Sequence, residues 1–192
     1  MKFFKLFPIA AFMFFLVPAM AQTEAPKGYS KGSITLPDST VITGYIKDNL
    51  KKDAVVTLQD EKTGDKKTYH AADIIAAEIE SNHYSCIKGD FFKVICNGEL
   101  AFLQKSSDAS SKPSYNGSEA IFISGTAGKP GDYFIYNNNS KQLELVSKKT
   151  FNVIINSAFT GCTAAIDKAK ATQGDIAQLK DAVELFNNRN SR

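Results

Sequence analysis

Short runs of apolar residues, separated by polar turn residues, follow one another from the start of the mature chain to about residue 146. Two runs, 33–36 and 41–46, flank a Pro37-Asp38-Ser39 segment. Proline, aspartate and serine each favour a turn, so this pattern predicts a β-hairpin. Further short strands are predicted at 54–58, 67–70, 74–79, 83–87, 120–124, 133–136 and 142–146.

The clearest local signal is the dipeptide Asn97-Gly98, which lies between the apolar runs 92–96 and 99–103. Asn-Gly is preferred in two-residue hairpin turns because both positions need a positive φ. We therefore expect a tight hairpin at Asn97-Gly98, with the strand at 83–87 beside it.

The apolar period changes near Lys148. Apolar residues then recur on one helical face, at positions 151, 154, 155, 158 and 159, and a short helix is predicted after Cys162. A last helix is predicted from a stripe at positions 176, 179, 183 and 186, preceded by a 172–175 segment that resembles a capping box. This stripe is typical of a helix that docks on the domain's own sheet.

Strands followed by helices, without alternation of the two, favour an α+β fold. We expect antiparallel β-hairpins that form an SH3-like barrel or a small sandwich, with C-terminal helices packed on the sheet. The expected parts of one compact domain are a β-rich region at 22–104, a flexible Ser-rich loop at 105–118, and a β-hairpin plus helices at 119–192. Long stretches without structure are functional or disordered, and disorder is the interpretation taken for 105–118.

The first 21 residues have the features of a secretory signal peptide. Lys2 and Lys5 give a positive start, residues 7–17 are almost wholly apolar, and Ala19-Met20-Ala21 has the small residues that a signal peptidase reads. Cleavage is predicted between Ala21 and Gln22. The apolar run is too short to span a bilayer, so no transmembrane anchor is expected after processing. We expect an exported protein that is periplasmic, envelope-associated or secreted.

Removing the leader changes the charge of the chain. The full sequence has 23 Lys and Arg against 20 Asp and Glu, and loss of Lys2 and Lys5 leaves a net charge of +1. A nearly neutral chain has no basic footprint for nucleic acid, so nucleic acid is not expected as a partner. The expected partner is an unknown protein or small ligand of the envelope or extracellular space.

Three cysteines remain in the mature chain: Cys86, Cys96 and Cys162. An oxidising compartment permits one disulfide and one free thiol, and three pairings are open. A cysteine on an apolar strand face can equally be a small buried residue.

No complete catalytic motif is present. The 125–130 segment resembles a phosphate-binding loop but has proline where a hydroxyl residue is needed. No catalytic residue, metal site or cofactor is therefore predicted. The remaining enzymatic alternatives are a thiol enzyme using Cys162, at a possible helix start, and a hydrolase using His70 and His83, whose spacing fits no metal-ligand pattern.

Four residues are candidates for ligand contact because their rings could stack on a ligand or bind its polar groups: Tyr69, His70, His83 and Tyr84. Strand tyrosines are also ordinary sheet residues, and histidines at strand edges are commonly exposed without a role.

Several short segments form a recognisable set: Gly28-Tyr29, the Gly44-Tyr45-Ile46 strand, the Asn97-Gly98 hairpin, Cys162, and the closing amphipathic helix with its Phe186-Asn187 pair. Together they resemble the segments of uncharacterised exported proteins of Bacteroidota. The resemblance implies export and no known activity. Residues 31–79 also resemble a small SH3-like barrel, a scaffold that serves many functions. We expect a non-enzymatic binding or interaction module, with a structural envelope component as a further alternative.

Overall fold

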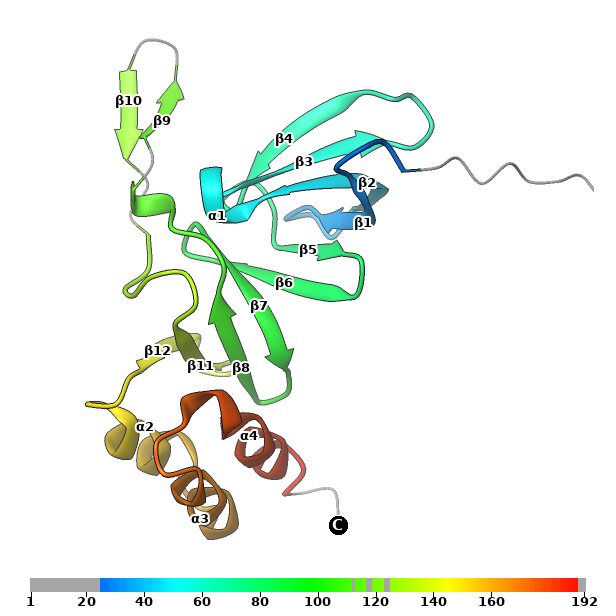
Figure 1. The fold of residues 1–192 in the computed structure, drawn as a ribbon. Coiled ribbons are helices and arrows are strands. Elements are labelled where there is room, and N and C mark those ends of the chain that lie inside the picture. The colour runs from blue at the N-terminus through cyan, green and yellow to red at the C-terminus, as the bar shows by residue number, and fades with distance from the viewer. Residues whose placement is uncertain (1–24, 112, 117–118, 123–124, 190–192) are drawn as a thin grey trace, which may run out of the picture.

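The computed structural model of the chain describes residues 25–111, 113–116, 119–122 and 125–189 (Figure 1). The strands are β1 (Ser30–Thr35), β2 (Val41–Asn49), β3 (Val55–Asp60), β4 (Lys66–His70), β5 (Ala76–Ile79), β6 (Asn82–Ile87), β7 (Asp90–Cys96), β8 (Leu100–Lys105), β9 (Pro113–Asn116), β10 (Glu119–Phe122), β11 (Tyr133–Asn137) and β12 (Gln142–Val146). The α-helices are α1 (Leu50–Asp53), α2 (Phe151–Ala158), α3 (Thr163–Ala171) and α4 (Lys180–Asn187), and the 3-10 helices are η1 (Ala109–Ser111) and η2 (Ile176–Leu179). The predicted leader, with its Ala21–Gln22 cleavage site, lies outside the described residues.

Ten of the described strands form one antiparallel sheet in the order β12-β11-β8-β7-β6-β5-β1-β2-β3-β4. β9 and β10 pair only with each other. Strands β4 and β12 are the two ends of the order, so the sheet is open and is not a closed SH3-like barrel. The reason is that β5 pairs with both β1 and β6, and the chain therefore extends the sheet instead of returning to β4. The alternative expectation, a small sandwich, stays a prediction.

The predicted α+β class, with C-terminal helices beside an antiparallel sheet, is confirmed (Figure 1). The face predicted for α2 is the buried one, since Phe151, Ile154 and Ile155 are each at most 6 % exposed. The proposed capping box is wrong in its detail. Thr172 is the C-cap of α3, and the carboxylate of Asp175 caps η2 by accepting the N–H of Ala177 at 3.2 Å.

The two-residue turn with two positive φ angles, predicted between β7 and β8, lies instead between β6 and β7. Lys88 and Gly89 have φ values of 49° and 83°, and they join β6 to β7 with Ile87 paired to Asp90. Two consecutive left-handed residues match the right-handed twist of the flanking strands.

Asn97 and Gly98 do join β7 to β8, but neither has a positive φ, and the pairing shifts register between Val94 and Cys96. The tight two-residue turn predicted there is wrong. A β-carbon at Gly98 would lie 2.5 Å from the side chain of Asn187, so packing against α4 explains the glycine.

Among the described residues, three apolar clusters lie on the sheet. The helix cluster joins β8, β11 and β12 to α2, α3, η2 and α4, and includes Phe102, Ile155 and Phe159. The N-terminal cluster fills the curve of β1–β6 and includes Ile34, Ile46, Val56 and Phe91. The back-face cluster consists of Phe92, Ala101, Leu103 and Phe134 with partly buried neighbours. Because strand side chains alternate, Phe102 and its neighbours Ala101 and Leu103 serve opposite faces of β8.

Residues 105–118, predicted as a flexible loop, contain the last residue of β8, helix η1 and strand β9. Figure 1 shows the β9–β10 hairpin extending away from the ten-stranded sheet. The flexibility of this segment stays a prediction.

Candidate functional site

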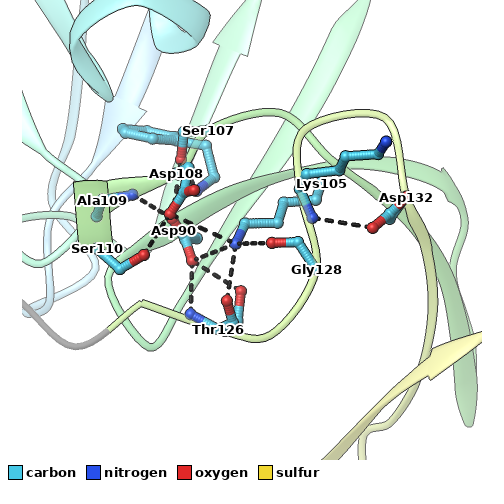
Figure 2. Close-up of polar contacts among 11 residues, drawn as sticks. Asp90, Lys105, Ser107, Asp108, Ala109, Ser110, Thr126, Gly128 and Asp132 are labelled. Carbon is cyan, nitrogen blue, oxygen red and sulfur yellow. Dashed lines mark hydrogen bonds and ion pairs between the residues drawn. The ribbon is translucent and has the colours of Figure 1, made fainter. Parts of the chain in front are cut away.

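Asp90 and Lys105 form a fully buried ion pair where β7 begins and β8 ends (Figure 2). Lys105 Nζ lies 3.2 Å from Asp90 Oδ2, and both side chains are 0 % exposed. Nζ also donates to the backbone oxygens of Thr126 at 2.8 Å and Gly128 at 3.0 Å. The buried ammonium therefore has an acceptor for each of its three N–H groups.

The carboxylate of Asp90 forms hydrogen bonds to both ends of the segment that leaves the sheet after β8 and returns at β11 (Figure 2). Its Oδ1 accepts the N–H of Ala109 at 2.7 Å and the hydroxyl of Ser107 at 3.4 Å. Its Oδ2 accepts the N–H and the hydroxyl of Thr126, each at 2.7 Å. Because the side chains of Asp90 and Lys105 have no exposed surface and their polar atoms are bound within the chain, we interpret this cluster as a structural anchor.

An open groove lies between the ends of β11 and β12 and the turn that joins α3 to η2. One hollow, the sheet lobe, has a volume of about 550 Å³ and is lined by Gly131, Asp132, Tyr133, Val146, Lys148 and residues 173–177. A second hollow, the helix lobe, has a volume of about 460 Å³ and is lined by Lys148, Phe151, Asn152, Lys170, Gln173 and Gly174. Since Lys148, Gln173 and Gly174 line both lobes, we treat the two as one sheet–helix groove.

The wall shared by the two lobes comes from a sharp reversal of the chain. Gln173 and Gly174 have φ values of 52° and 83°, so two consecutive left-handed residues separate α3 from η2. Glycine adopts this conformation without strain, whereas glutamine does so at a cost. After this reversal, residues 173–177 line the sheet lobe, and Gln173 and Gly174 line the helix lobe as well.

The two lobes differ in charge. Of the described residues, two lysines and no acidic residue line the helix lobe. In the described part of the chain, neither Lys148 nor Lys170 forms an ion pair. The sheet lobe carries two carboxylates, and both bind their own loops: Asp132 accepts the N–H of Lys129, and Asp175 accepts from Ala177 and Gln178.

The start of α2 places Lys148 at the groove. Ser147 and Thr150 bond reciprocally, because Thr150 Oγ1 accepts the N–H of Ser147 at 3.0 Å and Ser147 Oγ accepts the N–H of Thr150 at 3.2 Å. The exposed Lys148 and Lys149 lie between them, and the first turn of α2 contains no acidic residue. A cation at the N-terminal end of a helix is disfavoured by the helix dipole.

The three cysteines are all free and partly buried. Cys86 packs on the N-terminal cluster, whereas Cys96 and Cys162 pack on the helix cluster. Burial raises the pKa of the Cys86 thiol to about 12 and also raises the pKa of Cys96. Both shifts disfavour the reactive thiolate.

The candidate histidines lie on different strands. His70 ends β4, and His83 is on β6, with four strands between them in the sheet. His83 lies opposite Glu78 on β5, with Nδ1 3.8 Å from the carboxylate. Within the described residues, no group of three or more His, Cys, Asp or Glu side chains is placed to hold a metal ion.

The two candidate tyrosines are largely buried. Tyr69 is 5 % exposed in the N-terminal cluster, with Lys67 Nζ 4.8 Å from its ring centre. Tyr84 is 8 % exposed and lines a separate hollow of about 370 Å³ beside α1. Burial, followed by the charges of Asp48 and Glu80, raises the pKa of Tyr84. Both tyrosines belong to the N-terminal cluster, and ligand contact by the four candidate residues stays a prediction.

Sequence reasoning missed the groove, because its walls come from three separated segments: 131–133, 146–152 and 170–177. One signal was available. Lys148 and Lys149 directly precede a predicted helix, where acidic residues are the favoured choice.

Among the described residues, no helix combines the length and the apolar character needed to cross a membrane. Comparisons of the chain with protein-family models, with curated proteins and with solved structures found no match.

Proposed function

We propose that the chain is an exported, non-enzymatic binding protein and that its ligand occupies the sheet–helix groove. The observation that supports this most is the groove itself, where apolar side chains such as Val146, Phe151 and Ile176 lie beside charged and amide side chains. Ligand sites in proteins are typically concave surfaces of this mixed kind.

The placement of the reactive groups supports a binding role over an enzymatic one. A nucleophile needs a base within hydrogen-bonding reach. Cys162 packs on the helix cluster, whereas His70 and His83 lie on β4 and β6. None of these three residues lines the groove.

Export rests on the predicted leader. Expression of the full chain should yield a mature protein that begins at Gln22 outside the cytoplasm, as read by N-terminal sequencing of cell fractions. A full-length product confined to the cytoplasm would contradict export.

The groove can be tested by filling it. Ala177 is exposed and lines the sheet lobe, whereas Ala164 is exposed on α3 and lines neither lobe. Ala177→Trp and Ala164→Trp add the same volume at exposed positions of the C-terminal helices, η2 and α3. Ala164→Trp is therefore the matched control.

The ¹⁵N NMR spectrum of the wild-type protein should change on addition of one member of a panel of sugars, sugar phosphates, amino acids and short peptides. The changes should centre on residues 146–152 and 170–177, and Ala177→Trp should abolish them while Ala164→Trp preserves them. Changes centred on Cys162 or the histidines would favour the enzymatic alternative, and no change with any probe would contradict a small-ligand role for the groove.

A further inference from the structure

We infer that the helix lobe takes the single anionic group, a carboxylate or phosphate, of a small ligand whose hydroxyl-bearing body lies in the sheet lobe. This inference rests on the proposed function, because it names the ligand class for the same groove.

The positive charge of the helix lobe favours an anionic group there. Lys148 and Lys170 line this hollow, no acidic residue does, and neither lysine has an ion-pair partner in the described part of the chain. Asn152 and Gln173 add neutral amide groups that can donate hydrogen bonds. A carboxylate or phosphate in this hollow would accept from ammonium and amide donors, and such charge-assisted bonds are the stronger ones.

The helix dipole accounts for the position of one of these two lysines but not for that of the other. Lys170 lies in the last turn of α3, where a cation is favoured by the helix dipole alone. Lys148 lies just before α2, where the same dipole disfavours it. An anion bound between the two lysines would offset the unfavourable position of Lys148. The position of Lys148 therefore supports an anion site more strongly than the position of Lys170 does.

The sheet lobe indicates the rest of the ligand. Asp132 and Asp175 line it together with the shared Lys148, so the carboxylates outnumber the ammonium there and a second anionic group would be disfavoured. Their carboxylates have acceptor capacity beyond the bonds to their own loops, which suits hydroxyl donors. Tyr133 supplies an aromatic side chain whose ring stacks on Phe102 at 5.3 Å with an interplanar angle of 15°. One anionic group and several hydroxyls describe an acidic sugar or a sugar phosphate, and not a polyanion.

The test uses the mature chain and four probes: glucose 6-phosphate, glucuronate, glucose and inorganic phosphate. Binding is followed by ¹⁵N NMR titration of the wild-type protein and of Lys148→Gln, Lys170→Gln and Lys149→Gln. Lys149 is the matched control because it is the exposed neighbour of Lys148 and lines neither lobe.

Glucose 6-phosphate or glucuronate should shift the signals of residues 148, 152, 173 and 174, and the tighter of the two identifies the anion as phosphate or carboxylate. Lys148→Gln should weaken this binding about tenfold, which is the loss of one charge-assisted contact of about 1.4 kcal/mol. Lys170→Gln should weaken it as well, and Lys149→Gln should change it less than twofold. Inorganic phosphate alone should bind more weakly than glucose 6-phosphate because it lacks the body for the sheet lobe.

Two results would overturn the inference in different ways. If glucose binds the groove as tightly as its charged derivatives, or if Lys148→Gln and Lys149→Gln behave alike, the anionic assignment is wrong while the groove remains the binding site. If the charged probes shift residues only outside 146–152 and 170–177, the groove is not their site, and the proposed function loses its support as well.

Discussion

At the scale of single residues, Asp90 and Lys105 depend on each other for burial. Each charge is removed from water completely, and each is balanced by the other and by backbone groups of Ala109, Thr126 and Gly128. A buried charge that loses its partner keeps the cost of its desolvation and has nothing to offset it. The pair therefore stabilises the fold only while both members are present.

Replacing Asp90 by asparagine should destabilise the protein by about 3–5 kcal/mol, because the ammonium of Lys105 then stays buried without a counter-charge. The double variant Asp90→Asn with Lys105→Met should recover part of this loss, since both charges are gone. Urea unfolding of the wild type, both single variants and the double variant measures the coupling.

A control for the Asp90 series is Glu184→Gln, which breaks the half-exposed pair with Lys180 and should cost about 0.5 kcal/mol or less. An Asp90→Asn variant as stable as Glu184→Gln would contradict the anchoring role of the buried pair.

The burial of the Cys86 thiol leads to a prediction about stability and labelling at high pH. Burial raises its pKa from 9.0 to about 12, so the folded chain holds this proton more tightly than the unfolded chain does. The contribution to stability is present below pH 9 and is lost as the pH rises from about 9 towards 12. At pH 8.5, iodoacetamide should label Cys86 far more slowly in the native protein than in urea, as measured by peptide mass spectrometry. Equal labelling rates in both states would contradict the burial of this thiol.

At the scale of elements, α4 is attached to the sheet by a side chain that behaves like a strand partner. Asn187 Oδ1 accepts the N–H of Leu100 at 2.9 Å, and its Nδ2 donates to the carbonyl of Leu100 at 2.8 Å. Arg189 adds an ion pair to Glu99 at 2.6 Å. The β7–β8 turn is thus held by α4 on one side and by Asn138, which donates to Gly98 O at 2.7 Å, on the other.

Asn187→Ala should lower the free energy of unfolding by about 1–3 kcal/mol, because both backbone groups of Leu100 lose their partner at a partly buried position. Asn188→Ala is the control, since Asn188 is exposed and adjacent. Gly98→Ala should destabilise the wild type, because its β-carbon meets the Asn187 side chain, and should cost less in the Asn187→Ala background. Additive losses in the double variant would show that the two residues do not meet.

The elements that sequence reasoning placed correctly are those with a local signal. The stripes of α2 and α4 and the alternation of the strands depend on residues close in sequence, and these were predicted. The type of turn at Asn97-Gly98 was not, because the glycine there is accounted for by the close approach of Asn187, far away in sequence, and not by a positive φ. The groove was missed for the same reason, since the fold alone brings Lys148, Lys170 and Tyr133 to one place.

At the scale of the whole molecule, one strand contributes to every cluster. Phe91 belongs to the N-terminal cluster, Phe92 to the back-face cluster, and Ile95 packs on the helix cluster. All three lie on β7, so loss of any one cluster removes support from the strand that the others share.

The chain should therefore unfold in a single transition. Ile46→Ala in the N-terminal cluster and Leu179→Ala in the helix cluster should each cost about 2–5 kcal/mol, because each truncates a buried side chain. Far-UV circular dichroism and tyrosine fluorescence should give coincident midpoints for the wild type and both variants. A variant that shifts one probe and leaves the other in place would show that the two halves unfold independently.

The contacts of Asp90 also indicate where the chain should tolerate an insertion or a cleavage. Its two carboxylate oxygens hold Ala109 and Thr126 against the same buried lysine, so the two ends of the intervening segment are fixed regardless of the length of chain between them. Lengthening a loop whose ends are already fixed adds little to its closure entropy. A protease site or a short foreign peptide introduced between these two residues should leave the remainder assembled, which makes the segment a natural place for a split reporter or an affinity tag.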